Sequence, residues 1–217
     1  MIKAVIFDYD GTLADRAKAT CSAFRIYLQN YVLEEKTDSV YLESLVQDLV
    51  LWDEFGSGNK RQMVERFNRK YGYSIDYEHF FNWWIKNLGT YEPLFENTLK
   101  TLEYLKTRYK LGIITNGTSI GQNTKIDSTN IRHYFDCIIV SDDFGKAKPE
   151  AAIFNEALKQ LAVLPQQAVY VGDSYSNDII GAYNAGITPV WIWCEDGRYN
   201  FDGVKRIYRI EDLIEIL

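Results

Sequence analysis

The 217-residue sequence has few cysteines and no long apolar run. Its three cysteines, Cys21, Cys137 and Cys194, are odd in number and far apart, so they form neither a disulfide framework nor a CxxC metal site. We interpret them as small buried hydrophobic residues in a reducing compartment. No stretch of about 18 apolar residues occurs, and the first apolar run ends at Asp8. We therefore expect no membrane span and no signal peptide, and a protein that is soluble and cytoplasmic.

Dense clusters of basic residues are also missing. The sequence contains 24 basic and 30 acidic residues, which gives a formal net charge of −6. A nucleic-acid backbone is therefore a poor match as a partner, whereas a small anionic ligand is compatible because local geometry decides its binding. Hydrophobic residues make up 47% and aromatic residues 15%, enough for the core of one domain, with or without a sizeable insertion.

Short apolar runs predict the strands of an α/β fold. Runs rich in Val and Ile, without polar alternation, are typical of strands covered on both faces. They span residues 2–7, 111–114, 137–140, 168–171 and 189–193. Helical patterns separate the later runs, as in the spacing of Leu99, Leu102 and Leu105. This alternation from about residue 91 onward predicts a doubly wound parallel sheet with right-handed crossovers.

Residues 16–90 interrupt the alternation with a series of helical patterns. These patterns cover residues 17–31, 39–55, 60–71 and 77–87. We interpret the segment as an inserted α-helical cap subdomain, and residues 1–15 with 91–217 as the catalytic core. Trp83 and Trp84 are expected to pack in the subdomain or against the core. The basic residues of one helix are expected to form a solvated face; they are Lys60, Arg61, Arg66, Arg69 and Lys70.

Polar residues follow the predicted strands at the points where the strands end. Ligands of open α/β sheets bind at the carboxyl ends of the strands, so we expect these residues to meet at one edge. They carry carboxylate, hydroxyl and ammonium groups and comprise Asp8, Asp10, Thr115, Lys148, Asp173 and Asp178. Carboxylates at close range raise one another's pKa, and a divalent cation removes that cost. Because the ligands are all oxygens, the sequence predicts Mg²⁺.

The chemistry of these side chains favours phosphoryl transfer. Asp8, held ionised by a metal and a lysine, can attack phosphorus and form an aspartyl-phosphate. Asp10 can act as a general acid and then as the base for water. Gly11 lets backbone N–H groups approach the phosphoryl oxygens. Thr115 can donate a hydrogen bond to them, and Lys148 supplies a fixed positive charge.

Four segments, in the same order, resemble the motifs of the haloacid dehalogenase-like (HAD) hydrolase superfamily. They are Asp8-Tyr9-Asp10-Gly11-Thr12-Leu13, Ile113-Ile114-Thr115-Asn116-Gly117, Lys148-Pro149 and Gly172-Asp173-Ser174-Tyr175-Ser176-Asn177-Asp178. The resemblance covers roughly residues 1–15 and 91–195, and four motifs, each after a strand, are far more specific than one. The insertion after the first motif resembles the superfamily's helical cap of the first type.

This resemblance implies a role for each matching residue. Asp8 would be the nucleophile and Asp10 the general acid and base. The residues that hold the phosphoryl group would be Thr115, Asn116 and Lys148. Tyr9, between the two aspartates, is bulkier than expected for its position, and we interpret it as tolerated.

The resemblance also implies a magnesium site. Its ligands would be the Asp8 carboxylate, the Asp10 backbone carbonyl and Asp173. Asp178 would act through a bound water or through the lysine, and Asn177 would belong to the same outer set.

A further group of residues is similar to one branch of the superfamily, which contains pyrimidine 5′-nucleotidases and N-acylneuraminate-9-phosphatases. The group is Thr115-Asn116-Gly117, Gln122, Lys125-Ile126 and Tyr134-Phe135-Asp136. That branch dephosphorylates small metabolites. The resemblance therefore implies a phosphomonoester hydrolase whose substrate is a nucleoside monophosphate or a sugar phosphate.

Several alternatives compete with this function. A phosphomutase or phosphotransferase of the same superfamily would form the same intermediate and return the phosphoryl group to a sugar. A haloacid dehalogenase would also use Asp8, but it needs neither a second aspartate nor a metal, so Asp10 argues against it. A binding module without catalysis would lack Asp8 or Asp10. A P-loop is excluded at residues 145–148, because Val140 stands where its first glycine is needed and Ala147 replaces its Ser/Thr.

Overall fold

The computed structural model describes residues 1–192 and 203–217. It divides into two compact units, which we call the core unit and the helical unit. The core unit consists of Met1–Asp15 and Leu94–Leu217, and the helical unit of Arg16–Pro93. Trp193 and Cys194, to which the sequence-based expectations extend, lie outside the described residues. Cys137 is buried, as expected, whereas Cys21 is half-buried.

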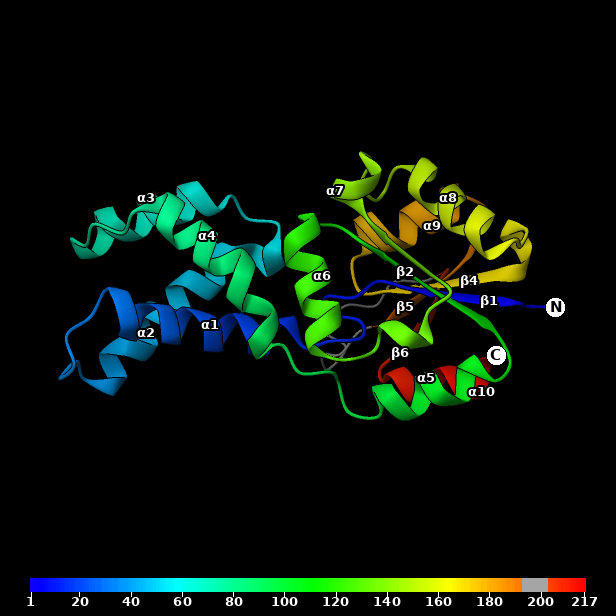
Figure 1. Ribbon diagram of the computed structural model, residues 1–217, viewed down its shortest axis with the longest axis horizontal. Helices are drawn as coiled ribbons and strands as arrows, with labels where there is room; N and C mark the ends of the chain where they lie inside the picture. The colour runs from blue at the N-terminus through cyan, green and yellow to red at the C-terminus, as the bar shows by residue number, and fades with distance from the viewer. Residues whose placement is uncertain (193–202) are drawn as a thin grey trace. The chain divides into compact units, whose positions relative to one another are not determined.

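The core unit is built on a six-stranded sheet in the order β3-β2-β1-β4-β5-β6 (Figure 1). Its strands are β1 (Ala4–Phe7), β2 (Lys110–Thr115), β3 (Cys137–Val140), β4 (Ala168–Gly172), β5 (Thr188–Ile192) and β6 (Lys205–Ile207). Every neighbouring pair runs parallel. The predicted parallel sheet is thus confirmed, with one strand more than the apolar runs indicate. The additional strand, β6, is short, lies at the edge and carries Lys205 and Arg206, so it lacks an apolar signature.

Helices cover both faces of this sheet, which makes it doubly wound. Val5 and Phe7 of β1 belong to one hydrophobic cluster, together with residues of α5 (Thr98–Lys106), α6 (Ser119–Ser128) and α10 (Leu213–Ile216). Ala4 and Ile6 belong to another cluster, together with residues of α8 (Ala151–Leu161) and α9 (Ile180–Asn184). Figure 1 shows α8 and α9 on one side of the strands and α5 and α10 on the other. The alternating side chains of β1 therefore feed both layers of the core.

Short helical segments complete the core unit. They are η3 (Arg132–Tyr134), α7 (Ser141–Phe144), η4 (Pro165–Gln167), the π-helix η5 (Tyr175–Ile179) and η6 (Ile210–Asp212). The chain passes from β1 to β2 on one side and returns to β4 on the other, so the strand order reverses around β1. Ligands of such sheets bind beside this reversal, beyond the carboxyl ends of the strands. The residues after β1 therefore occupy the position at which a site is expected.

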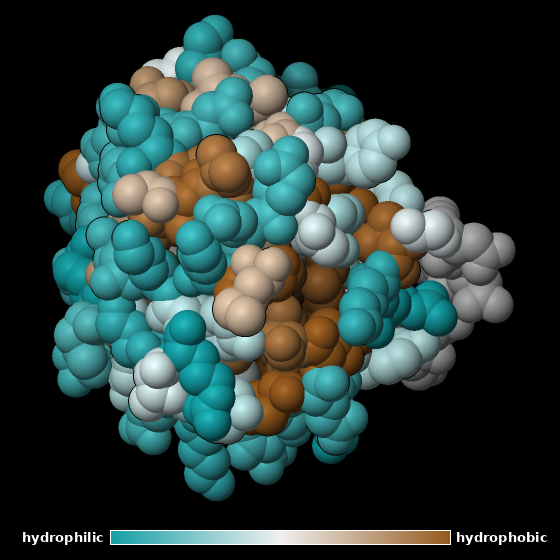
Figure 2. All heavy atoms as spheres, turned by 90° about the vertical axis from the view of Figure 1, so that its right-hand side faces the viewer, coloured by the Kyte–Doolittle hydropathy of each residue, from teal (hydrophilic) through white to brown (hydrophobic). Residues whose placement is uncertain are grey.

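At the opposite end of the sheet, where the strands begin, several lysines line the surface. Figure 2 shows the side of the molecule on which the N-terminus lies in Figure 1, with hydrophobic residues gathered near the centre of a largely hydrophilic face. A cavity of about 470 Å³ is lined there by residues that include Lys3, Lys106 and Lys110. Lys106 pairs with Asp136 at 2.7 Å, and Lys110 donates to the Leu161 carbonyl at 2.7 Å. These cations therefore hold the ends of the core elements together.

The helical unit contains four α-helices and two 3₁₀ turns. They are α1 (Arg16–Tyr31), α2 (Ser39–Asp53), η1 (Glu54–Gly56), α3 (Lys60–Tyr71), α4 (Tyr77–Asn87) and η2 (Leu88–Tyr91). Side chains of Asp38, Asn59 and Asp76 accept backbone N–H groups at the starts of α2, α3 and α4. Aromatic stacking fills the interior, with Phe24 at 4.5 Å from Trp84 between ring centroids. No helix within residues 1–192 and 203–217 combines the length and apolarity needed to cross a membrane.

A buried ion cluster links three helices of this unit. Asp53, whose side chain is 1% exposed, pairs with Arg16 at 2.6 Å and with Lys60 at 2.8 Å. Burial would raise the pKa of Asp53, but the two cations lower it overall. The prediction of a solvated basic face is therefore wrong for Lys60, whose side chain is 11% exposed. The other four basic residues of α3 are exposed, and Arg66 also stacks on the Trp52 ring at 4.2 Å.

Candidate functional site

The site begins where β1 ends. The backbone N–H of Asp8 donates to the Val171 carbonyl at 2.9 Å. Pairing with β4 therefore continues one residue beyond β1 and fixes the backbone position of Asp8. The Asp8 side chain is buried and accepts a hydrogen bond from Lys148 Nζ at 2.6 Å. The same ammonium group lies 2.7 Å from Asp178 Oδ1. One buried cation therefore joins two carboxylates that are far apart in the sequence.

Tyr170 of β4 also contacts both Lys148 and Asp178. Lys148 Nζ donates to the Tyr170 hydroxyl at 3.1 Å, and that hydroxyl donates to Asp178 Oδ1 at 2.9 Å. The other oxygen of Asp178 accepts the backbone N–H of Ser174 at 3.0 Å. Burial, together with the charges of Asp178 and Asp8, raises the pKa of Tyr170 well above its ordinary value, so the phenol stays a donor. Sequence reasoning missed Tyr170, because a tyrosine inside an apolar strand reads as core.

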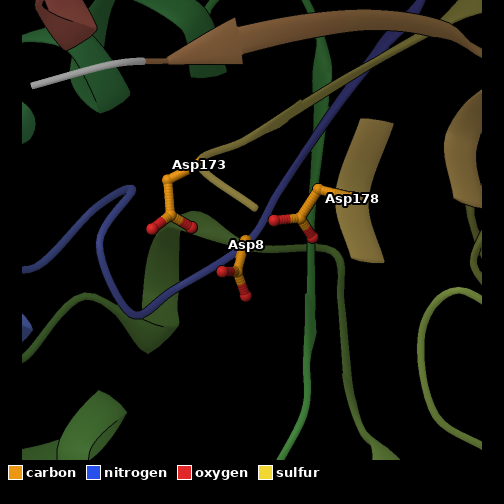
Figure 3. Close-up of side chains that lie close together, drawn as sticks. All are labelled: Asp8, Asp173 and Asp178. Atoms are coloured by element: carbon orange, nitrogen blue, oxygen red, sulfur yellow. The ribbon is translucent and has the colours of Figure 1, made fainter. Parts of the chain in front are cut away.

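Three carboxylates form a compact acidic cluster. Asp8, Asp173 and Asp178 each contribute an oxygen, and these oxygens lie within 4.8 Å of one another (Figure 3). Asp8 follows β1, Asp173 follows β4, and Asp178 lies in the π-helix η5. Lys148 offsets part of their charge, and the cluster remains negative when all three are ionised.

The excess negative charge appears in the pKa values of the cluster. Burial raises the pKa of Asp8 to about 7; the charge of Asp178 adds to this, and Lys148 opposes it. Burial and then the charge of Asp8 raise the pKa of Asp173 well above its usual range. Burial would lower the pKa of Lys148, but Asp178 and Asp8 raise it overall, so this side chain stays an ammonium. The cluster therefore favours the uptake of positive charge.

Two glycines leave room for the acidic side chains. Gly11 has a φ of +78°, and a Cβ placed on it would lie 2.2 Å from Asp173 Oδ2. A Cβ on Gly172 would lie 2.4 Å from Cβ of Asp178. Any larger residue would therefore displace a carboxylate of the cluster. Oxygen donors at this separation, in a buried negative cluster, fit a hard divalent cation such as Mg²⁺.

Asp10 lies close by, but its carboxylate has separate partners. One oxygen, Oδ1, is paired with the ammonium group of Lys125, and Oδ2 accepts the Gln122 amide at 2.8 Å. The same amide nitrogen contacts the hydroxyl of Thr115 at the end of β2. Sequence reasoning named Gln122 and Lys125 as part of a resemblance and gave them no contact with Asp10.

Tyr9 is more than tolerated between the two aspartates. Its side chain is fully buried, and its hydroxyl donates to the Lys125 carbonyl at 2.9 Å. The hydroxyl also lies 3.2 Å from Thr129 Oγ1. These contacts were not foreseen from sequence, because the spacing of a motif does not reveal what an intervening residue contacts.

Asn116 and Asn177, the two asparagines expected near the site, each take part in hydrogen bonds that hold a loop. The Asn116 side chain donates to the Lys148 carbonyl at 3.0 Å and accepts the Lys148 N–H at 2.9 Å. It therefore holds the loop that carries the buried ammonium group. The N–H of Asn177 donates to Ser174 Oγ at 3.4 Å, within the turn that leads to Asp178.

Comparisons with known proteins agree with this geometry. A profile of the haloacid dehalogenase-like hydrolase family matches residues 5–192. Glyceraldehyde 3-phosphate phosphatase of Methanothermobacter thermautotrophicus is 31% identical over 95% of this chain and 92% of its own length. Pyrimidine 5′-nucleotidase YjjG of Escherichia coli is 34% identical over 53% of this chain and 51% of its own. The expected relationship to the superfamily is thus confirmed, and the nucleotidase similarity, which spans about half of each chain, agrees with the expected branch.

Solved structures of haloacid dehalogenase-like proteins are also similar to this chain. The HAD phosphatase from Thermococcus onnurineus is 28% identical, with a TM-score of 0.67 over 99% of this chain and 97% of that chain. The HAD-hydrolase YfnB from Bacillus subtilis, bound to magnesium, has a TM-score of 0.78 at 24% identity over 99% of this chain and 98% of that chain, which supports the fold. The chain therefore belongs to the haloacid dehalogenase-like hydrolase family, and phosphatase is the activity class that its relatives support.

Proposed function

We propose that this chain is a Mg²⁺-dependent phosphomonoester hydrolase that forms an aspartyl-phosphate on Asp8 and acts on a small phosphorylated metabolite. The observation that carries the proposal is the cluster of Asp8, Asp173 and Asp178, in which one buried lysine, Lys148, pairs with Asp8 and Asp178. Its negative charge exceeds what Lys148 balances, and its oxygens suit a divalent cation that would in turn attract a phosphate group.

The first half of the reaction transfers the phosphoryl group to the enzyme. An oxygen of Asp8 attacks phosphorus, and the bond from phosphorus to the ester oxygen breaks as the new bond forms. Asp10 donates a proton to the departing oxygen, so the leaving group departs as an alcohol. Lys148 and the hydroxyl of Thr115 offset negative charge on the phosphoryl oxygens.

The second half releases inorganic phosphate. Water attacks phosphorus of the aspartyl-phosphate while Asp10, now a carboxylate, accepts a proton from it. The bond from phosphorus to the Asp8 oxygen breaks, and the Asp8 carboxylate is restored. Asp10 therefore returns to its protonated form, and the two half-reactions balance.

The Mg²⁺ site in this proposal uses Asp8, Asp173 and the backbone carbonyl of Asp10, with Asp178 holding Lys148 beside it. When bound, the ion supplies positive charge that polarises the phosphoryl group and screens Asp8 from it. Thr115, Asn116 and Lys148 form the phosphate-binding part of the site. The side chain of Asn116 holds the loop that positions Lys148. Asn177 helps to hold the turn that positions Asp178.

The names of the relatives support the proposed substrate class. They include enzymes named for glyceraldehyde 3-phosphate and for pyrimidine 5′-nucleotides. Both are small phosphomonoesters of an alcohol, which is the class that the mechanism requires. We propose that residues 16–90, expected to act as the cap over the core of residues 1–15 and 91–217, select within that class.

Phosphate release is the test of the proposed function. Purified protein is assayed with glyceraldehyde 3-phosphate, nucleoside monophosphates, sugar phosphates and p-nitrophenyl phosphate, with Mg²⁺ and with EDTA. We expect activity with Mg²⁺ and a loss to background with EDTA. Asp8→Asn is expected to lower kcat by more than about 10⁴-fold, as for other nucleophile replacements.

The intermediate is tested separately by acid quench and mass spectrometry. During turnover, one phosphate is expected on the peptide that contains Asp8. Activity that persists in EDTA or in Asp8→Asn would overturn the mechanism. Transfer of the phosphoryl group to a second sugar in place of water would identify the chain as a phosphomutase instead.

A further inference from the structure

Two polar side chains on the buried face of α6, Gln122 and Lys125, contact Asp10. Gln122 and Lys125 are three residues apart, so they lie on the same side of the helix. Both are buried, with 3% and 6% of their surfaces exposed. Burying an ammonium group and an amide is costly unless each finds a partner. Their position therefore needs an explanation beyond packing, and Asp10 supplies it.

The two side chains hold both oxygens of one carboxylate. Lys125 pairs with Oδ1 of Asp10, and Gln122 donates to Oδ2 at 2.8 Å. A carboxylate held at one oxygen can still rotate about its last bond, whereas one held at both oxygens has a fixed plane. The Asp10 side chain is 18% exposed, so it keeps access to solvent while its orientation is set.

Two further contacts tie this pair to the rest of the site. The Tyr9 hydroxyl donates to the backbone carbonyl of Lys125 at 2.9 Å, so the residue next to Asp10 fixes the turn of α6 that carries the lysine. The Gln122 amide also contacts Thr115, in the proposed phosphate-binding set. A Cβ on Gly117 would lie 2.9 Å from Cγ of Gln122, so the loop after β2 packs closely on this side chain.

From this geometry we propose that Gln122 and Lys125 are positioning residues that orient Asp10 for proton transfer, with Tyr9 anchoring the helical turn of Lys125. The proposal rests on the proposed function, because Asp10 acts there as the proton donor and acceptor. Proton transfer depends strongly on the direction and distance of the donor, so fixing the carboxylate plane increases the rate of the step that Asp10 serves. Lys125 contacts Asp10, and Gln122 contacts Asp10 and Thr115; the proposed role requires no contact of either side chain with the substrate.

A pair of substrates separates this role from a purely structural one. An alkyl phosphate needs a proton on its leaving oxygen, whereas p-nitrophenolate leaves without one. The value of kcat/KM covers the steps up to formation of the aspartyl-phosphate. In Lys125→Met, we expect kcat/KM for glycerol phosphate to fall by about 10²-fold, the usual contribution of a general acid. For p-nitrophenyl phosphate, it is expected to change less than about threefold, because little proton transfer is needed.

Two other variants extend the test. Gln122→Met changes no charge and is expected to give the same difference between the substrates, which keeps the test available if Lys125→Met does not fold. Tyr9→Phe is expected to lower kcat/KM for the alkyl phosphate by about fivefold, the effect of one hydrogen bond. Lys125→Arg, which keeps the charge, is expected to recover part of the loss.

The matched control is Asp127→Asn on the same helix. Asp127 is 60% exposed and pairs with Arg132 at 2.6 Å. We expect no change with either substrate in this variant. Equal losses with both substrates in Lys125→Met and Gln122→Met, or no loss, would overturn the positioning role while the proposed function stands. A wild-type protein without Mg²⁺-dependent phosphate release would overturn the proposed function and this inference with it.

Discussion

Two buried ion clusters, one in each unit, combine the same kinds of side chain in opposite proportions. In the helical unit, a single carboxylate, Asp53, lies between Arg16 and Lys60. In the core unit, a single ammonium group lies between Asp8 and Asp178, with Asp173 close by. The pKa of Asp53 is lowered, whereas that of Asp8 is raised to about 7. Burial raises the pKa of both carboxyl groups; at Asp53 two cations outweigh it, whereas at Asp8 the single cation does not.

This difference separates a cluster whose carboxylate is balanced by cations from one that retains excess negative charge. Its two cations stabilise the ionised form of Asp53 by more than burial destabilises it, so its negative charge is already balanced. In the core cluster, burial and mutual repulsion destabilise the ionised carboxylates by more than Lys148 stabilises them. Uptake of a cation would therefore lower the free energy of the cluster. Breaking one cluster should therefore affect mainly stability, and breaking the other mainly metal binding and catalysis.

Lys148→Met should break the core cluster. The substitution removes the positive charge that lies 2.6 Å from Asp8 and 2.7 Å from Asp178, and should lower kcat by about 10²–10³-fold. Phosphate-release assays measure it. Lys146→Met is the control, since Lys146 is 56% exposed and pairs with Glu150 at 3.1 Å. A fall of less than about tenfold in Lys148→Met would contradict the electrostatic role.

Asp53→Asn should break the other cluster. It removes the carboxylate that Arg16 and Lys60 share, and we expect the free energy of unfolding to fall by about 3 kcal/mol. Urea denaturation provides the measurement. Glu43→Gln removes an exposed partner of Arg25, paired at 2.6 Å, and should cost less than about 0.5 kcal/mol. Similar losses in the two variants would show that burial of the cluster is unimportant.

Magnesium should stabilise the protein through the core cluster and leave the helical one untouched. At a Mg²⁺ concentration about 100 times its Kd, the free energy of unfolding is expected to rise by about 2.7 kcal/mol over the value in EDTA. Asp173→Asn should abolish this gain, and Asp53→Asn should keep it. Retention of the full gain in Asp173→Asn would place the ion elsewhere.

Acid titration of the protein in EDTA should change the free energy of unfolding with opposite signs for the two clusters. Because the pKa of Asp53 lies below its ordinary value of 3.8, its stabilising contribution is present above that pH and is lost as the pH falls through the lowered pKa. Asp8 has a raised pKa, so its contribution is present below 3.8 and is lost as the pH rises toward about 7. Urea denaturation across this range measures both.

The matched variants identify each contribution to the acid titration. The stability difference between the wild type and Asp53→Asn should narrow below pH 3.8. Asp8→Asn should be less sensitive to pH than the wild type between 3.8 and about 7. Parallel curves for all three proteins would mean that neither carboxyl group is shifted.

Much of the core could be predicted from sequence because buried parallel strands have a strong signature. Residues 137–140 form β3 as expected, and β4 extends the predicted run 168–171 by one residue. β6 was missed, since a three-residue edge strand with two cations has no apolar pattern. Lys60 was misassigned because its partner, Asp53, lies on a different helix, and periodicity describes only one helix at a time.

The candidate site was predictable to the extent that its residues follow strands. Asp8, Thr115 and Asp173 could be found from the order of the sheet, since parallel strands end at one edge. The contacts among them could not be found in this way. Tyr170 reaches the site from inside an apolar strand, where its residue type does not distinguish it from packing residues. Gln122 was singled out by the resemblance, but its position on a helix gave no indication of a contact with Asp10.

The buried hydroxyl of Tyr9 has a consequence for the evolution of this sequence. Its bonds to the Lys125 carbonyl and to Thr129 make residue 9 a partner of a helix more than a hundred positions away. A lineage that loses the tyrosine must anchor that helical turn in another way, so substitutions at positions 9 and 129 should occur together. An alignment of close homologues would show this as covariation between the loop after β1 and the end of α6.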